Sequence, residues 1–253
     1  VSETQGEVMD NTNGNIICQI YTLNCAQMPD ISCEYLYSLL PASRRSRADS
    51  IRHPASRARS ICAAALLYAV LDKPLEPGVT VEQLQAEELL TGAVARAADR
   101  FPLDWTPDAN GKPFPAGIRG LPELNGPLYV SLSHSGDWVA AALSDRPVGL
   151  DIQVDSRLRE SAMRGIVGKF HAHEQKKLEE LEGTAFRDAF YRWWTMKESV
   201  MKLTGKGLGL ALNSFAVHPV EEGWYAAVLD GRGIRLHSRM WEDCWMSCAQ
   251  WEP

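Results

Sequence analysis

Two acidic residues and a lysine in the second half of the chain have the types and spacing of a phosphate-handling site. Asp151 lies in the apolar stretch 148–154, where the strand period of two places Asp151 and Gln153 on one face and the aliphatic side chains on the other. A carboxylate held on a strand can bind Mg²⁺, which prefers hard oxygen ligands. Since an edge-strand aspartate is more often a solvated residue, this stretch alone is a weak indication.

The second group lies in a helical stretch further along the chain. Trp194, Glu198 and Lys202 are spaced i, i+4 and i+8, which predicts one helical stripe with an aromatic, an acid and a base. Glu198 could complete the metal site that Asp151 begins, and Lys202 could neutralise a phosphate beside it. The alternative is an i,i+4 ion pair on a helix surface, which is worth only about 0.3–0.5 kcal/mol.

Further candidate phosphate contacts lie in the first half. Ser133 and His134 stand among hydroxyl side chains at the end of an expected strand, and Lys112 projects from a tight turn. Residues 44–59 carry six arginines against one acid, Asp49, and guanidinium groups match phosphate oxygens bidentately. A solvated basic helix face is the competing explanation. The six are Arg44, Arg45, Arg47, Arg52, Arg57 and Arg59.

Two patterns typical of metal or redox sites are incomplete. His171 and His173 form an HxH pair followed by Glu174, but without further ligands this favours a polar helix face over zinc. The six cysteines form no CxxC pair, so we expect reduced thiols, mostly buried.

Helices and a few strands must position these residues. We expect helices, interrupted at Pro41 and Pro54, over 32–71, and a second helical stretch over 161–204 that breaks near Gly183. The proline-rich segment 101–127 reads as loop. Strands are expected at 16–23, 128–133, 138–143, 148–154 and within 215–251, with 138–154 forming a hairpin through the turn 144–147. Each half then contains helices and antiparallel strands, which makes the fold class α+β.

Composition limits the function classes. The chain has 253 residues, 45% of them hydrophobic and 23% charged, with a net charge of −6, as in an ordinary globular protein. The acidic balance argues against bulk nucleic-acid binding. The longest apolar run, 61–71, is shorter than the roughly 20 residues of a membrane span. The first fifteen residues show no secretory signal, so we expect a flexible leader over 1–15 and a cytoplasmic setting.

In this order, the motifs resemble the 4′-phosphopantetheinyl transferases of the surfactin-synthetase-activating (Sfp-like) type. A Gly-x-Asp strand followed some forty residues later by WxxKExxxK is specific, whereas Gly-x-Asp alone is not. The matching pieces are Gly111-Lys112-Pro113, Ser131-Leu132-Ser133-His134, Val148-Gly149-Leu150-Asp151-Ile152, Phe190 to Ser199 with Lys202, and Gly205-Lys206-Gly207-Leu208.

The resemblance implies two similar α+β subdomains, 16–146 and 147–253, related by a pseudo-twofold with coenzyme A in the cleft between them. It implies a monomeric enzyme that moves phosphopantetheine from coenzyme A to a serine of an apo acyl or peptidyl carrier protein and releases adenosine 3′,5′-bisphosphate. Phosphoryl-group transfer of this kind depends on charge neutralisation and positioning.

The resemblance also assigns roles to residues of this chain. Asp151 and Glu198 would hold Mg²⁺, Lys202 would contact the pyrophosphate, and Glu198 is the candidate base. Lys112, Ser133 and His134 would hold the adenosine end and its 3′-phosphate, together with Arg44, Arg47 and Arg59.

One position departs from the family pattern. Many members carry a second carboxylate two residues after the strand aspartate, where this chain has Gln153, a neutral and weaker Mg²⁺ ligand that water could replace. This departure motivates an alternative, a non-catalytic coenzyme A-binding regulator or scaffold of a carrier-protein system. A metal-dependent phosphohydrolase is a third reading, but the chain lacks the additional ligands of a two-metal site.

Overall fold

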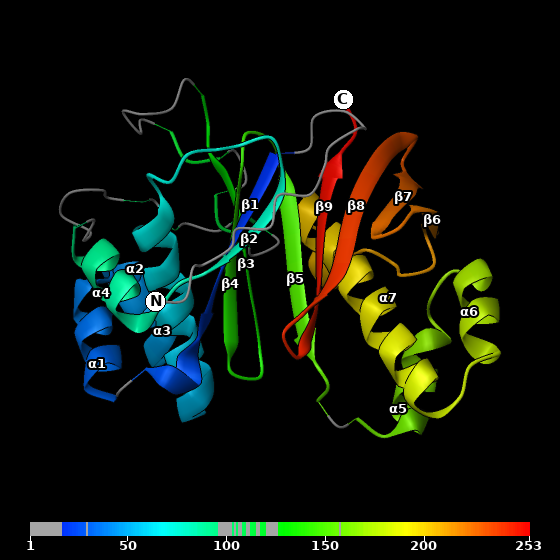
Figure 1. Ribbon diagram of the computed structural model, residues 1–253, viewed down its shortest axis with the longest axis horizontal. Coiled ribbons are helices and arrows are strands. Elements are labelled where there is room, and N and C mark those ends of the chain that lie inside the picture. Colours follow the sequence, from blue (N-terminus) through cyan, green and yellow to red (C-terminus); the bar gives the residue numbers. More distant parts are fainter. Residues whose placement is uncertain are drawn as a thin grey trace, which may run out of the picture. The chain divides into compact units, whose positions relative to one another are not determined.

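The computed structural model divides into two compact units, Val1–Pro147 and Val148–Pro253 (Figure 1). The structure describes residues 17–28, 30–95, 126–156 and 158–253, and within the intervening segment 103, 105, 108, 109, 112–114 and 117–119. The expected leader over 1–15 lies outside the described residues, as does part of the expected loop over 101–127.

The first unit is a four-stranded sheet with helices on one face (Figure 1). The order is β2-β1-β4-β3, and the central helix α3 packs against β1, β3 and β4. The strands are β1 (Ile17–Asn24), β2 (Gly78–Gln83), β3 (Tyr129–Ser135) and β4 (Trp138–Ser144), and the helices are the short η1 (Cys25–Gln27), α1 (Asp30–Leu39), α2 (Ala42–Asp49), α3 (Pro54–Val70) and α4 (Ala86–Ala95).

Prolines separate these helices as the sequence predicts. Pro41 is the residue before α2, and Pro54 occupies the first turn of α3, where its missing N–H costs no hydrogen bond. The second half of α3 is buried on every side from Ser60 to Val70. This apolar helix therefore forms the centre of the core of the unit.

One pairing in the first unit differs from the expected antiparallel arrangement. β1 and β2 are parallel, with Ile17 opposite Gly78, whereas β1 and β4 are antiparallel. The chain leaves β1, passes through α1, α2 and α3, and returns to the same edge of the sheet. A connection of this length is what a parallel pair requires.

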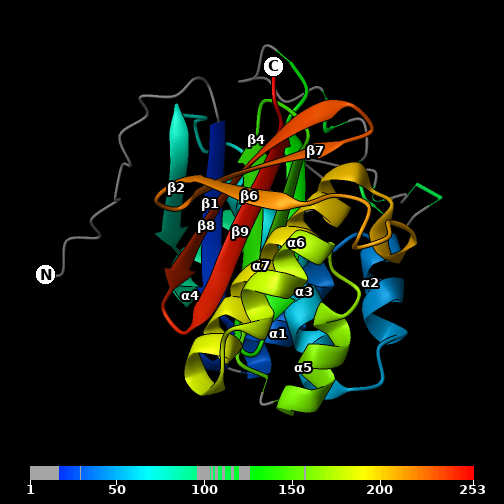
Figure 2. The ribbon, with the colours of Figure 1, turned by 90° about the vertical axis from the view of Figure 1, so that its right-hand side faces the viewer.

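The second unit is a five-stranded antiparallel sheet packed on a long helix. The order is β5-β9-β8-β7-β6, and Figure 2 shows α7, in yellow, lying over β8 and β9. The strands are β5 (Val148–Val154), β6 (Val217–Glu221), β7 (Trp224–Leu229), β8 (Arg232–Trp241) and β9 (Cys244–Trp251), and the helices are α5 (Glu160–Val167), α6 (Ala172–Glu179), α7 (Gly183–Thr204) and the short η2 (Gly207–Gly209).

The hairpin expected over 138–154 is wrong. β4 pairs with β1 on one side and β3 on the other, and β5 pairs with β9 in the other sheet. Both edges of β4 are therefore occupied. The hairpin is instead β3–β4, which turns at Gly136, whose positive φ of 55° suits glycine.

The α+β class is confirmed, and so is the expected state of the cysteines. All six are free thiols, and Cys18, Cys62, Cys244 and Cys248 are buried. In the described part of the chain, no helix combines the length and apolarity that crossing a bilayer needs.

Candidate functional site

The Gly-x-Asp motif fixes how β5 meets α7. A Cβ atom at Gly149 would overlap the carbonyl oxygen of Ser199 and the backbone nitrogen of Leu203, so only glycine lets the two backbones approach this closely. Asp151 shares this face of the strand because side chains alternate with a period of two. The glycine therefore brings the aspartate against the second half of α7.

Asp151 and Lys202 meet at this contact. The Nζ atom of Lys202 donates to Oδ1 of Asp151 at 2.8 Å, and the aspartate side chain is only 9% exposed against 29% for the lysine. The structure thus joins the strand and helix motifs, which lie about fifty residues apart in the sequence. Lys202 keeps an accessible cation beside a largely buried carboxylate.

Glu198 lies one helical turn before Lys202 and is half-buried. Burial first, and then the negative charge of Asp151, raise the pKa of Glu198 from 4.5 to about 7, and Lys202 opposes this shift. The negative charges of the two carboxylates repel each other. A divalent cation would relieve this repulsion, so this pair of hard oxygen donors fits Mg²⁺.

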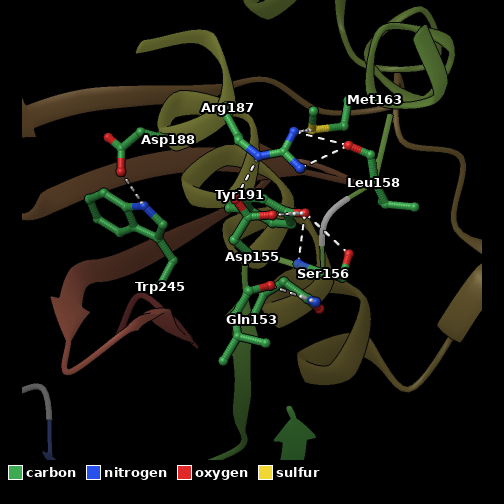
Figure 3. A network of polar contacts seen from close by, with 10 residues as sticks. Gln153, Asp155, Ser156, Leu158, Met163, Arg187, Asp188, Tyr191 and Trp245 are labelled. Atoms are coloured by element: carbon green, nitrogen blue, oxygen red, sulfur yellow. Dashed lines mark hydrogen bonds and ion pairs between the residues drawn. The ribbon is translucent and has the colours of Figure 1, made fainter. Parts of the chain in front are cut away.

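Gln153 follows on the same strand face and is half-buried. Its Nε2 atom donates to the carbonyl oxygen of Val154 at 3.2 Å, which leaves Oε1 as its remaining polar atom (Figure 3). Whether Gln153 holds a metal stays a prediction.

Buried hydroxyl groups pin α7 to the sheet beside Asp151. The Thr195 hydroxyl lies 2.8 Å from the Ser247 hydroxyl, which in turn donates to Ser238 at 2.9 Å. Ser247 is also the cross-strand neighbour of Asp151. This chain of bonds fixes α7 at a point three residues before Glu198.

Lys197, inside the WxxKE motif, is a structural residue. Its ammonium group is fully buried, lies 2.7 Å from Oε2 of Glu174, and donates to the carbonyl oxygens of Leu212 and Phe215. Burial lowers the pKa of Lys197, and Glu174 opposes that shift. The other oxygen of Glu174 accepts from the backbone N–H of Val217 at 2.7 Å, so the pair ties α7 to α6 and to the start of β6.

In the first unit, one of the arginines of α3 reaches the β3–β4 turn. Arg59 donates to the carbonyl oxygen of Gly136 at 3.0 Å, two residues beyond His134. His134 is exposed at the end of β3, whereas Ser133 is buried. The structure therefore gathers Arg59, His134 and Ser133 at one corner of the unit.

Arg44 and Arg47 of α2 differ in environment. The Arg44 guanidinium lies over the Trp105 ring at 4.4 Å and contacts the Ser60 carbonyl oxygen at 3.5 Å, beside Arg59 on α3. Burial lowers the pKa of Arg44, and the charge of Arg47 lowers it further. Arg47 is exposed. The contacts of Arg44 with Trp105 and Ser60 are thus mainly packing contacts within the unit. Arg47 is the more accessible of the two cations.

Lys112 lies close to the same aromatic cluster. Trp105 packs on Phe114 at 4.8 Å, two residues after Lys112, and the Lys112 backbone N–H donates to Oδ1 of Asp108 at 2.9 Å. Burial lowers the pKa of Lys112 to about 8, and Asp108 opposes the shift. An anion bound beside Lys112 would stabilise the protonated, positively charged form of its amine.

The histidine pair takes part in contacts at the start of α6. His171 caps α6 by accepting from the His173 backbone N–H, and His173 lies beside His218 with ring centroids 4.9 Å apart. Among the residues described, no group of three or more His, Cys, Asp or Glu side chains is arranged to hold a metal ion.

Three residues near the site, Asp155, Arg187 and Tyr191, were assigned no functional role from the sequence. Asp155 continues the alternation of Asp151 and Gln153, and it bonds to Arg187 and Tyr191 of α7. The signal was present, because Tyr191 precedes Glu198 by seven residues and so shares its helix face.

Comparison with known proteins supports the resemblance. Residues 147–249 match the model of the 4′-phosphopantetheinyl transferase superfamily. This match covers nearly all of the second unit, including Asp151, Glu198 and Lys202. The similarity to Sfp-like transferases that the motifs indicate is thereby confirmed.

Several curated relatives are similar over part of the chain. The 4′-phosphopantetheinyl transferase psf-1 of Bacillus pumilus is 36% identical over 46% of this chain and 46% of its own length. A 4′-phosphopantetheinyl transferase of Bacillus subtilis is 34% identical over 55% and 59%, and the L-aminoadipate-semialdehyde dehydrogenase-phosphopantetheinyl transferase of Xenopus laevis is 36% identical over 48% and 42%. The chain spans about half the length of the curated relatives it matches.

Proposed function

We propose, from the match of residues 147–249 to the 4′-phosphopantetheinyl transferase superfamily, that this chain transfers phosphopantetheine from coenzyme A to a serine hydroxyl of an apo carrier protein. The observation that carries the proposal is the contact of Asp151 with Lys202 beside Glu198, which brings the two halves of the motif together. The relatives are transferases by name, which supports catalysis over a coenzyme A-binding scaffold.

In the proposed reaction the serine oxygen attacks the phosphorus on the pantetheine side of the pyrophosphate. The bond from that phosphorus to the bridging oxygen breaks, and adenosine 3′,5′-bisphosphate leaves with the electron pair. Glu198 is the candidate base that accepts the serine proton, since it is a half-buried carboxylate beside Asp151 and Lys202. Lys202 neutralises charge on the pyrophosphate.

Asp151 and Glu198 are the residues that would hold Mg²⁺. The ion, when bound, supplies positive charge that stabilises the leaving phosphate. Lys202 can pass from Asp151 to the pyrophosphate as the site fills, since its side chain is partly exposed.

Side chains of the first unit supply the proposed contacts for the adenosine end of coenzyme A. Arg47 and His134 are exposed, and Arg59 bonds to the turn two residues beyond His134. Lys112 and Ser133 complete the proposed set. A 3′-phosphate is an anion that guanidinium groups bind bidentately. Arg44 contributes mainly by packing on Trp105.

The experiment incubates the protein with coenzyme A, Mg²⁺ and a panel of apo carriers, and reads intact masses. Addition of one phosphopantetheine to a carrier supports the proposal. Absence of any addition, with coenzyme A bound, contradicts it and favours the scaffold. The Glu198→Gln variant should lose about 10² to 10⁴ in rate while it still binds coenzyme A; parental turnover would mean that the base is misassigned.

A further inference from the structure

Strand β5 runs antiparallel to α7, and residues on one face of β5 and the residue just after it contact the helix. Gly149 meets Ser199 and Leu203 at one end, and Asp151 meets Lys202 next. Asp155, just after the strand, meets Tyr191 and Arg187 near the beginning of the helix. The candidate metal ligands of β5 thus lie between two fixed contacts.

The contact at Asp155 is a network rather than a single ion pair (Figure 3). Arg187 Nε lies 2.5 Å from Oδ2 of Asp155, and the Tyr191 hydroxyl donates to Oδ1 at 3.1 Å. The same hydroxyl accepts from the Ser156 backbone N–H at 3.0 Å. Arg187 also donates through both terminal nitrogens to the Leu158 carbonyl oxygen, at 2.9 and 2.8 Å. The side chains of Tyr191 and Arg187 therefore fix the backbone at Ser156 and at Leu158, just after β5.

We infer that Asp155, Arg187 and Tyr191 are positioning residues, which set the separation of Asp151 and Glu198 by fixing β5 along α7. Asp155 is four residues after Asp151 and one residue past the end of β5, and Tyr191 is seven residues, or two turns, from Glu198 on the same helix face. If α7 shifted along β5, the separation of Asp155 from Tyr191 and that of Asp151 from Glu198 would change together. This inference rests on the proposed function.

A positioning role and a purely structural role predict different effects of substitution on the free energy of unfolding and on Mg²⁺ affinity. The Asp155 side chain is 48% exposed and that of Arg187 is 26% exposed, and such pairs stabilise a fold very little. Residues that orient metal ligands, in contrast, typically change metal affinity by about 10- to 100-fold when altered. In the proposed reaction none of the three residues needs to touch the substrate.

The test measures Mg²⁺ binding by calorimetry, with coenzyme A present, in the parent and in Asp155→Asn and Tyr191→Phe. We expect each variant to bind Mg²⁺ about tenfold more weakly. The Km for the apo carrier should stay unchanged, because the network lies outside the proposed contacts with that substrate. Arg187→Lys keeps the charge opposite Asp155 and should recover part of the affinity that Arg187→Ala loses.

Asp230→Asn is the matched control. It removes another exposed ion pair of the same unit, with Lys206 at 3.1 Å, at the turn between β7 and β8. Parental Mg²⁺ affinity in both Asp155→Asn and Tyr191→Phe overturns the inference, as does an equal loss in Asp230→Asn or an absence of Mg²⁺ binding in the parent. Failure of the proposed function is a separate outcome, since it appears as absent carrier modification in the parent.

Discussion

Gly149 and Ser199 stand in backbone-to-backbone contact, with no space for a methyl group between the strand and the helix. The Gly-x-Asp motif therefore has a packing requirement at its first residue and a chemical one at its third. Both are met on a single face of β5.

Gly149→Ala should destabilise the second unit and weaken the site. The added Cβ would push β5 away from α7, and overpacking of this kind typically costs about 1–3 kcal/mol or more. Urea unfolding and Mg²⁺ titration would measure the two effects. Gly165→Ala in α5 is the control, because nothing lies within 4 Å of its Cβ position and alanine favours helix. A parental midpoint in Gly149→Ala would contradict the packing argument.

The raised pKa of Glu198 predicts a pH-dependent stability in metal-free protein. The folded state holds this proton up to about pH 7, whereas the unfolded chain releases it near pH 4.5. The free energy of unfolding should therefore fall as the pH rises from 4.5 to 7, by at most about 3 kcal/mol from this group. Urea titrations of the parent and of Glu198→Gln should show a difference that vanishes below pH 4.5. A difference independent of pH would refute the assignment.

The lowered pKa of Lys112 predicts how coenzyme A affinity changes in alkaline solution. Above a pKa of about 8 the free protein presents a neutral amine, so an anionic ligand binds less tightly as the pH rises from 8 to 10. Calorimetry should show this decline in the parent and a flatter profile in Lys112→Met. Parallel profiles in the two proteins would place Lys112 away from the ligand.

Breaking the buried Lys197–Glu174 pair should cost far more than breaking a surface pair. Lys197→Met leaves a buried carboxylate without its cation, which typically costs about 3–5 kcal/mol. The double variant Lys197→Met, Glu174→Gln removes that charge and should recover part of the loss. Lys206→Met, which breaks an exposed pair with Asp230, should cost less than about 1 kcal/mol. Equal costs for the two single variants would show that the pair adds nothing through its burial.

His237 predicts acid sensitivity of the second unit. Burial first, and then Arg239, lower the pKa of His237 from 6.5 to about 4, so the unfolded chain binds its proton before the folded protein does. Stability from this group is present above pH 6.5 and is lost as the pH falls to 4, by up to about 3 kcal/mol. His237→Phe keeps an aromatic ring against Trp224 and should flatten the acid limb of the stability profile. An unchanged limb would exclude His237 as its source.

Local patterns predicted much of this fold. Pro41 and Pro54 separate helices as expected, and the apolar run 61–71 is the buried half of α3 together with the residue that follows it. The i, i+4 spacing of Glu198 and Lys202 placed them on one helix face, and strand alternation placed Asp151 on the face of β5 opposite the aliphatic side chains. Helix boundaries and the face on which a residue lies depend on residues nearby in the sequence. They could therefore be predicted from the sequence alone.

Long-range pairings could not be read in the same way. The turn 144–147 has the residues of a hairpin, yet β5 pairs with β9 because both edges of β4 are occupied by β1 and β3. The parallel β1–β2 pair also joins distant segments. Lys197 looked like part of a chemical motif, and only the burial of Glu174 beside it shows its structural role. Which strand or side chain pairs with which depends on the other partners available in the folded chain. The sequence of one segment does not contain that information.

The pairing of β5 with β9 sets an order of events during synthesis. Val148 finds its ladder partner only at Gln250, so the strand that carries Asp151 stays unpaired until residues 244–251 have left the ribosome. The first unit closes its sheet earlier, since its last strand is β4. N-terminal units generally fold first as a chain emerges. In a nascent chain that stops before residue 244, the first sheet would thus be complete, whereas β5 would lack its hydrogen-bonding partner strand β9.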